Sequence, residues 1–118
     1  MARKYLRKNE FRYYNKPEFS SKSGEPHPAH ITAKHHKKFK FNLITHSKTF
    51  FNSETKELTK NPNRNPDGLK DKRKSRVSKP MWDKDKYFSE ETLKNWRFDK
   101  KDKAAVKKWN KKWEKKKR

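Results

Sequence analysis

The sequence contains no cysteine, which excludes disulfide bonds, thiolate zinc sites and a thiol nucleophile. It has only two glycines, Gly24 and Gly68, so the glycine-rich phosphate loop of nucleotide hydrolases is absent. No apolar run approaches the ~20 residues of a membrane-spanning helix. No apolar core of a signal peptide follows the basic N-terminus. These absences predict a cytoplasmic protein without a membrane span, and we expect no cofactor.

Acidic residues are also scarce: 14 Asp and Glu accompany 36 Lys and Arg in 118 residues, which gives a formal net charge of +22. Self-repulsion at this charge destabilises a compact monomer, so we expect a neutralising partner. Each Lys or Arg that neutralises a nucleic-acid phosphate releases a condensed counterion, which supplies affinity without sequence recognition. The composition therefore predicts a nucleic-acid-binding protein that contacts phosphates, with RNA favoured slightly over DNA. Such a protein would be found wherever its nucleic acid is, including in a virion.

Hydrophobic residues make up only 27% of the chain, although 14% of it is aromatic. Aromatic side chains bury large areas, so they can hold one small core together. The clearest pattern is the alternation of apolar and polar residues over 29–46, which predicts two strands with one buried face. The apolar positions are Ala29, Ile31, Ala33, Phe39, Phe41 and Leu43. Placing Ile31 opposite Leu43 brings all of them to one face, and we prefer this register of the hairpin.

The C-terminal third has a helical pattern. Ser89 and Asp99 are each suited to cap the N-terminus of a helix. The helix after Asp99 is predicted to reach about Lys115, with Trp109 and Trp113 on the apolar stripe that packs on the sheet. Lysines cover the rest of that helix, and lysine acts as a point charge without reading bases in a bidentate manner. We therefore expect little sequence specificity.

These patterns divide the chain into four parts. We predict a basic, aromatic N-terminal arm over 1–25, a β-rich core over 26–68, a basic linker over 69–88, and a helical basic segment over 89–118 that packs on the core. The predicted fold class is α+β: a small antiparallel sheet or barrel with a basic C-terminal helix and a flexible N-terminal arm. The predicted phosphate-binding residues are Arg7, Arg12, Lys37, Lys38, Lys40, Arg73, Lys74, Arg76, Lys107, Lys108, Lys111 and Lys112.

The histidines are the basis of an alternative, enzymatic hypothesis. In the preferred register His30 and His46 are diagonal neighbours on the polar face of the hairpin, roughly 7–8 Å apart. Two imidazoles at this separation could act as base and acid on a phosphodiester, as in a metal-independent, toxin-like ribonuclease. The remaining histidines lack further ligands at zinc-like spacing, so we predict no metal site. Two other options are a ribosome- or phage-associated structural protein and an inhibitor that binds an acidic protein surface.

Three short motifs suggest a relationship. His27-Pro28 ahead of a strand, Thr45-His46-Ser47 and Asn61-Pro62-Asn63 together resemble small basic proteins of bacterial phages and other mobile elements. The resemblance covers roughly residues 26–64. It implies a small β-barrel-like domain and a mobile-element setting, in which a toxin-like role is one option.

Overall fold

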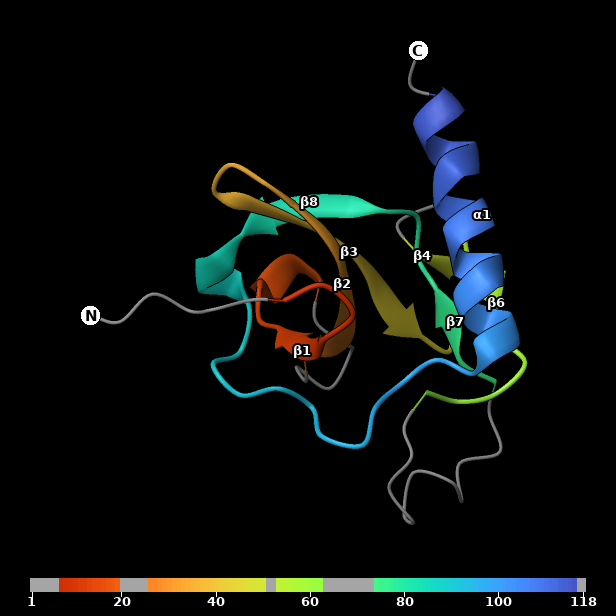
Figure 1. Cartoon of the computed structure of the whole chain (residues 1–118), viewed down its shortest axis with the longest axis horizontal. Helices are drawn as coiled ribbons and strands as arrows, with labels where there is room; N and C mark the ends of the chain where they lie inside the picture. Colours follow the sequence, from red (N-terminus) through yellow and green to blue (C-terminus); the bar gives the residue numbers. More distant parts are fainter. Residues whose placement is uncertain (1–6, 20–25, 51–52, 63–73, 117–118) are drawn as a thin grey trace.

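A computed structural model describes residues 7–19, 26–50, 53–62 and 74–116 (Figure 1). They form a small, curled antiparallel sheet and one C-terminal helix, which confirms the predicted α+β fold. The strands are β1 (Phe11–Tyr14), β2 (His27–His35), β3 (Lys38–Thr45), β4 (Thr49–Phe50), β5 (Ser53–Glu54), β6 (Lys56–Glu57), β7 (Arg76–Val77) and β8 (Met81–Lys84). The short 3-10 helices η1 (Pro17–Phe19) and η3 (Asp85–Tyr87) follow β1 and β8, and helix α1 spans Lys100–Lys116.

Strand β3 is the centre of the sheet. It pairs with β2 along one edge, and with β8 and then β7 along the other. Strand β1 extends the sheet beyond β2, β6 extends it beyond β7, and β4 and β5 form a separate two-stranded ladder. The segment after η3 then returns to the free edge of β1, where Ser89 N–H donates to Tyr13 O at 2.9 Å and Leu93 N–H donates to Phe11 O at 2.8 Å. This return makes the sheet barrel-like.

The two faces of the sheet carry separate cores, because successive side chains of a strand point to opposite faces. The interior of the curled sheet holds Tyr14, Ala29, Ile31, Phe39, Phe41, Leu43 and Phe88. The other face lies under helix α1, and its core consists of Phe11, Ile44, Leu58, Val77, Val106 and Trp109. Figure 1 shows the helix standing beside β6 and β7, where this second core lies. The Trp stripe therefore packs on the sheet as predicted.

The predicted register of the hairpin is wrong by two residues. Ile31 pairs with Phe41, not with Leu43, and the turn closes between His35 and Lys38. A shift of two residues leaves every side chain on the same face, so the apolar pattern cannot distinguish these registers. The tight turn decides between them, and His36 takes a left-handed backbone conformation there, with φ of 56°.

A β-bulge interrupts the hairpin after Ile31. Between Ile31 and Ala33 the pairing shifts by one residue, so that Ala33 lies opposite Lys40. A bulge of this kind bends the strand and increases its twist. Ala33 is only half-buried and lines a pocket between the sheet and helix α1.

The division into segments also differs from the prediction. Strand β1 lies within the predicted arm but belongs to the sheet, and β7 and β8 lie within the predicted linker. The stretch from Ser89 to Asp99 contains no helix, although a helix was predicted there. The Ser89 hydroxyl instead accepts a bond from Tyr13 N–H at 3.1 Å and donates to Glu91 O at 2.8 Å. The Ser89 side chain therefore hydrogen-bonds to the edge of β1 and does not cap a helix.

Helix α1 begins as predicted after Asp99, whose carboxylate accepts a bond from Lys101 N–H at 3.3 Å. A second carboxylate, Asp102, is buried and holds the first turn of the helix to the loop after β6. It accepts bonds from Thr59 N–H at 2.8 Å and Lys60 N–H at 3.1 Å. A carboxylate that accepts backbone N–H groups forms strong, charge-assisted hydrogen bonds. The start of the helix is therefore fixed on the sheet.

Candidate functional site

Helix α1 carries a row of lysines along one flank of its buried stripe. Lys103, Lys107 and Lys111 are spaced by four residues, which places them above one another on the same side of the helix. All three are exposed, whereas Val106 and Trp109 of the adjacent stripe are buried. The row is therefore presented to solvent at the boundary between the helix and the sheet.

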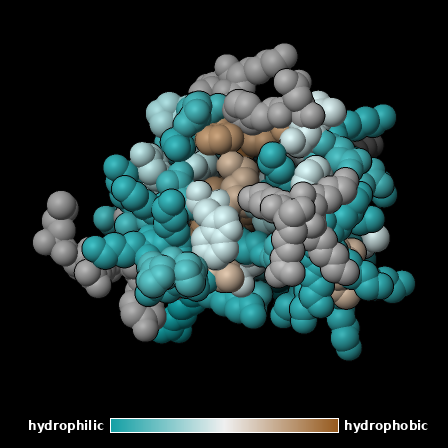
Figure 2. Space-filling view, turned by 90° about the horizontal axis from the view of Figure 1, so that it is seen from above, coloured by the Kyte–Doolittle hydropathy of each residue, from teal (hydrophilic) through white to brown (hydrophobic). Residues whose placement is uncertain are grey.

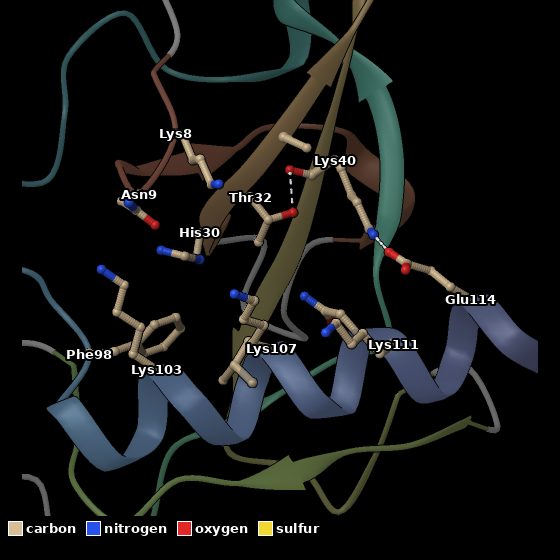
Figure 3. Close-up of a pocket in the computed structure, with 13 residues that line it drawn as sticks. Lys8, Asn9, His30, Thr32, Lys40, Phe98, Lys103, Lys107, Lys111 and Glu114 are labelled. Carbon is tan, nitrogen blue, oxygen red and sulfur yellow. Dashed lines mark hydrogen bonds and ion pairs between the residues drawn. The ribbon is translucent and has the colours of Figure 1, made fainter.

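This lysine row forms one wall of a pocket of about 380 Å3 (Figure 3). The opposite wall comes from β2, β3 and the segment before β1, and Phe98 closes the end nearest the start of the helix. The pocket is lined by Lys8, Asn9, His30, Thr32, Ala33, Lys40, Phe98, Lys103, Val106, Lys107, Asn110, Lys111 and Glu114. Figure 3 shows that the side chains of Lys8, Lys103 and Lys107 point into the space between the two walls.

The pocket has a large excess of positive charge. Lys8, Lys103, Lys107 and Lys111 make no ion pair with any described carboxylate. Only Lys40 is compensated, because its ammonium group pairs with Glu114 at the far end of the pocket. Like charges gathered around a concave surface raise the local concentration of anions. This lysine-lined pocket is therefore suited to hold an anion.

His30 lies at the base of the pocket. It is on β2 opposite Asn42 and is only 6% exposed. Its ring packs between Phe11, at a centroid distance of 4.8 Å, and Phe98, at 4.4 Å. Burial, with a smaller contribution from the charge of Lys103, lowers the pKa of His30 to about 4. The imidazole is therefore neutral at pH 7, and its Nδ1 has no hydrogen-bond partner among the described residues.

The structure does not assemble the pair of histidines predicted for a ribonuclease. His30 lies opposite Asn42, and His46 is four residues beyond Asn42 in the sequence. At the rise of an extended chain, this separates His30 from His46 by about 13 Å along the strand direction. His46 is exposed, and its Nδ1 lies 3.1 Å from Lys74 O. One histidine is thus buried under the helix while the other is at the surface. The predicted pairing is wrong because it depended on the wrong register.

Two of the predicted phosphate-binding arginines stabilise the fold. Arg12 is 5% exposed, and its Nη1 donates to Ser89 O at 2.8 Å and to Glu90 O at 2.7 Å. Arg76 donates from Nε to Thr55 Oγ1 at 2.7 Å and from Nη2 to Thr55 O at 2.8 Å. Both guanidinium groups join segments that are distant in the sequence. Neither is available as an exposed phosphate ligand.

The other predicted phosphate-binding residues are spread over the surface. Lys37 and Lys38 lie at the exposed tip of the β2–β3 hairpin, and Arg7 and Lys74 are also exposed. Lys108 and Lys112 lie on the opposite flank of α1, where Lys112 is 3.4 Å from Glu54 and lies over the Trp109 ring. Arg73 is outside the described residues. Among the predicted residues the pocket unites Lys40, Lys107 and Lys111 with His30.

Several residues of the pocket were not predicted from the sequence. Lys103 could have been found, because it precedes Lys107 by one helical turn on a helix that was predicted correctly. Lys8, Asn9 and Phe98 could not have been found, because they reach the pocket only through the curling of the sheet. Asn9 takes a left-handed backbone conformation with φ of 72°, which asparagine tolerates better than most residues.

Most of the face seen in Figure 2 is hydrophilic, with a small hydrophobic area between the polar side chains. Within the described part of the chain, no three His, Asp or Glu side chains gather as metal ligands. No helix in the same part is long and apolar enough to cross a membrane.

Comparisons with known protein families, curated proteins and solved structures gave no match for this chain.

Proposed function

We propose that the protein binds nucleic acid through phosphate contacts made by the lysine-lined pocket and the exposed lysines of α1, with RNA favoured over DNA. The observation that carries the proposal is the convergence of Lys8, Lys103, Lys107 and Lys111 on one concave surface, where no carboxylate of the described residues pairs with them. Ion pairs are the ordinary partners of clustered cations, so a cluster without them favours an external anion. The net charge of +22 over the whole chain points to a polyanion.

The geometry of α1 supports contact with an extended anion. Lys103 and Lys111 are two turns apart, about 12 Å along the helix axis. A strand of nucleic acid lying along this flank could place successive phosphates near successive lysines. The row therefore suits a polymer better than a single small anion.

The identity of the exposed cations favours low sequence specificity. Arginine reads guanine edges in a bidentate manner, whereas lysine offers a point charge that neutralises phosphate. Arg12 and Arg76 are engaged within the fold, and the pocket is lined by lysines with no arginine among them. We favour RNA because its loops and ends present single strands with unstacked bases that can enter a concave site.

The test is fluorescence anisotropy with a labelled single-stranded RNA, the matching single-stranded DNA and a duplex, measured over a series of salt concentrations. Neutralisation of about four phosphates on a single strand gives a slope of log affinity against log salt near −3. We expect this slope, with tighter binding to RNA than to the duplex. Absence of binding to all three ligands at low salt would falsify the proposal. Stronger binding to an acidic polypeptide than to RNA would also overturn it.

A further inference from the structure

We propose that the lysine-lined pocket binds one terminal nucleotide of a strand and holds its end as a phosphate monoester. This inference rests on the proposed function and makes it more specific. The protein would then recognise strand ends, in addition to holding the backbone along α1. Three features of the pocket carry the inference: its size, its charge and the environment of His30.

The pocket is sized for a single unit of a polymer. Its volume of about 380 Å3 is near the lower end of the roughly 300–1,000 Å3 range of small-molecule sites. The Lys40–Glu114 ion pair stands at one end, and Phe98 lies at the other. A double helix cannot enter a space of this size, whereas one nucleotide at the end of a strand can.

The charge of the pocket exceeds what an internal phosphate would neutralise. Four ammonium groups converge here, from Lys8, Lys103, Lys107 and Lys111, while the fifth lysine is paired with Glu114. A phosphodiester carries a single negative charge. A phosphate monoester carries about −1.5 to −2 at pH 7 and offers three strong acceptor oxygens. The monoester therefore matches this cluster better, and within a nucleic acid only a strand terminus provides one.

The base of the pocket supplies an apolar surface and one side of an imidazole ring. Phe98 and Val106 provide an apolar surface for a sugar or base. His30 lines the same space, is more than nine-tenths buried, and has an Nδ1 with no partner among the described residues. Because Nδ1 is shielded from the pocket, a ligand would meet the remainder of the imidazole ring. Figure 3 shows the ring directed towards Asn9 and Lys103, where a bound nucleotide would lie.

The charged and polar groups around His30 come from every element that surrounds it. Lys8 and Asn9 precede β1, Lys103 is on α1, and Thr32 follows on β2 itself. The one described carboxylate that lines the pocket is Glu114, at its far end, which is already paired with Lys40. An anion bound beside His30 would thus meet cations and neutral donors, and no other carboxylate of the described residues lines the pocket.

The experiment compares three single-stranded RNAs of identical sequence and length, with a 5′-phosphate, with a 3′-phosphate, or with hydroxyl groups at both ends. We expect one phosphorylated form to bind at least about tenfold more tightly than the hydroxyl form. The two phosphorylated arms identify which end is held. Competition by a nucleoside monophosphate, measured separately, shows whether a free nucleotide is held as well as a strand end.

A matched pair of variants locates the effect. Lys107→Gln removes a pocket lysine, and Lys108→Gln removes its exposed neighbour on the opposite flank of α1. We expect the first to abolish the preference for the phosphorylated end and the second to retain it. His30→Gln is a further variant, and if it does not fold, the lysine pair still decides the question.

The outcomes separate the two proposals. Equal affinity for phosphorylated and hydroxyl ends would overturn the terminal-nucleotide inference while leaving nucleic-acid binding intact. A preference that survives Lys107→Gln unchanged would place the phosphate monoester elsewhere and would also overturn it. No binding of any of the three RNAs would overturn the proposed function itself.

Discussion

The side-chain amides of Asn42 and Asn110 hydrogen-bond to each other in both directions across the interface between β3 and α1. Asn42 Nδ2 donates to Asn110 Oδ1 at 2.8 Å, and Asn110 Nδ2 donates to Asn42 Oδ1 at 3.0 Å. Both residues are buried, and Asn42 Nδ2 and Trp109 Nε1 also donate to Ser78 O. A reciprocal amide pair has strict geometry, so it fixes the rotation of the helix. It thereby decides which flank of lysines faces the pocket.

We predict that Asn110→Ala lowers the free energy of unfolding by about 1–3 kcal/mol, because it leaves the buried Asn42 amide oxygen without a donor. Urea denaturation followed by circular dichroism measures the change. Lys111→Ala is the matched control: it alters the next residue, which is exposed, and should stay within about 0.5 kcal/mol of the wild type. If the Asn110 variant is as stable as this control, the amide pair does not fix the helix.

Arg12 is expected to affect stability and not binding. Arg12→Gln removes the bonds from Nη1 to Ser89 O and Glu90 O, which hold the returning segment on β1. Hydrogen bonds from a charged donor contribute about 1.5–3 kcal/mol, and we expect a loss of this size in thermal or urea unfolding. RNA affinity, measured under conditions where the variant is fully folded, should stay within about twofold of the wild type. A loss of about 1.4 kcal/mol in binding free energy would instead weaken the affinity tenfold. Arg7→Gln, at an exposed position, serves as the control for stability.

The pocket lysines should dominate binding. Replacing Lys103, Lys107 and Lys111 together by Gln removes three phosphate ligands, so the slope of log affinity against log salt for single-stranded RNA should become less negative by about 2. The control triple, Lys48, Lys84 and Lys94 to Gln, removes the same charge from exposed positions outside the pocket. Anisotropy titrations of both triples against one RNA provide the comparison. Equal losses in the two triples would mean that only total charge matters.

Glu114 is expected to weaken binding in the wild-type protein. Glu114→Gln releases the Lys40 ammonium and raises the net charge of the pocket by one, so RNA affinity at low salt should increase. The gain should disappear at high salt, because Glu114 is half-exposed and its field is screened. Glu18→Gln, which removes an acid paired with Lys16, is the control for net charge. Tighter binding by the control variant alone would contradict this role of Glu114.

The low pKa of His30 makes stability depend on pH. The pKa is about 4 in the folded protein and 6.5 when the side chain is free, so the unfolded chain binds more protons between these values. The free energy of unfolding should therefore be highest above pH 6.5 and fall as the pH decreases towards 4. The pKa difference corresponds to a loss of roughly 3 kcal/mol.

Urea denaturation at several pH values measures this loss, and an NMR titration of the His30 ring measures its pKa directly. Carboxylates titrate in the same range, so the comparison is with His30→Gln, which should lack this part of the pH dependence. A His30 resonance that titrates near 6.5 in the folded protein would refute the prediction.

Local patterns in the sequence predicted the elements that depend on near neighbours. The alternation around Ile31 and Phe41 predicted the hairpin, and the Asp99 cap with the Trp stripe predicted helix α1. The offset of the hairpin could not be predicted, because registers two residues apart bury the same side chains. Ser89 was wrongly predicted to cap a helix. Its actual donor, Tyr13 N–H, lies 76 residues earlier, and local sequence patterns cannot reveal so distant a partner. Most of the pocket was missed, and for Lys8, Asn9 and Phe98 the reason is the same, since only tertiary contacts bring them to this site.

The closure of the sheet by the segment after η3 has a consequence for synthesis. The hydrogen bond from Tyr13 N–H to the Ser89 hydroxyl spans 76 residues, so β1 lacks one of its neighbours until that later segment has been translated. Translation proceeds at roughly 5–20 residues per second, so this edge of β1 stays unpaired for about 4–15 s in the nascent chain. An open edge is a template for wrong pairing between chains, and charged side chains beside it are the usual protection. Arg7 and Lys8, a few residues before β1, would keep neighbouring nascent chains apart during this interval.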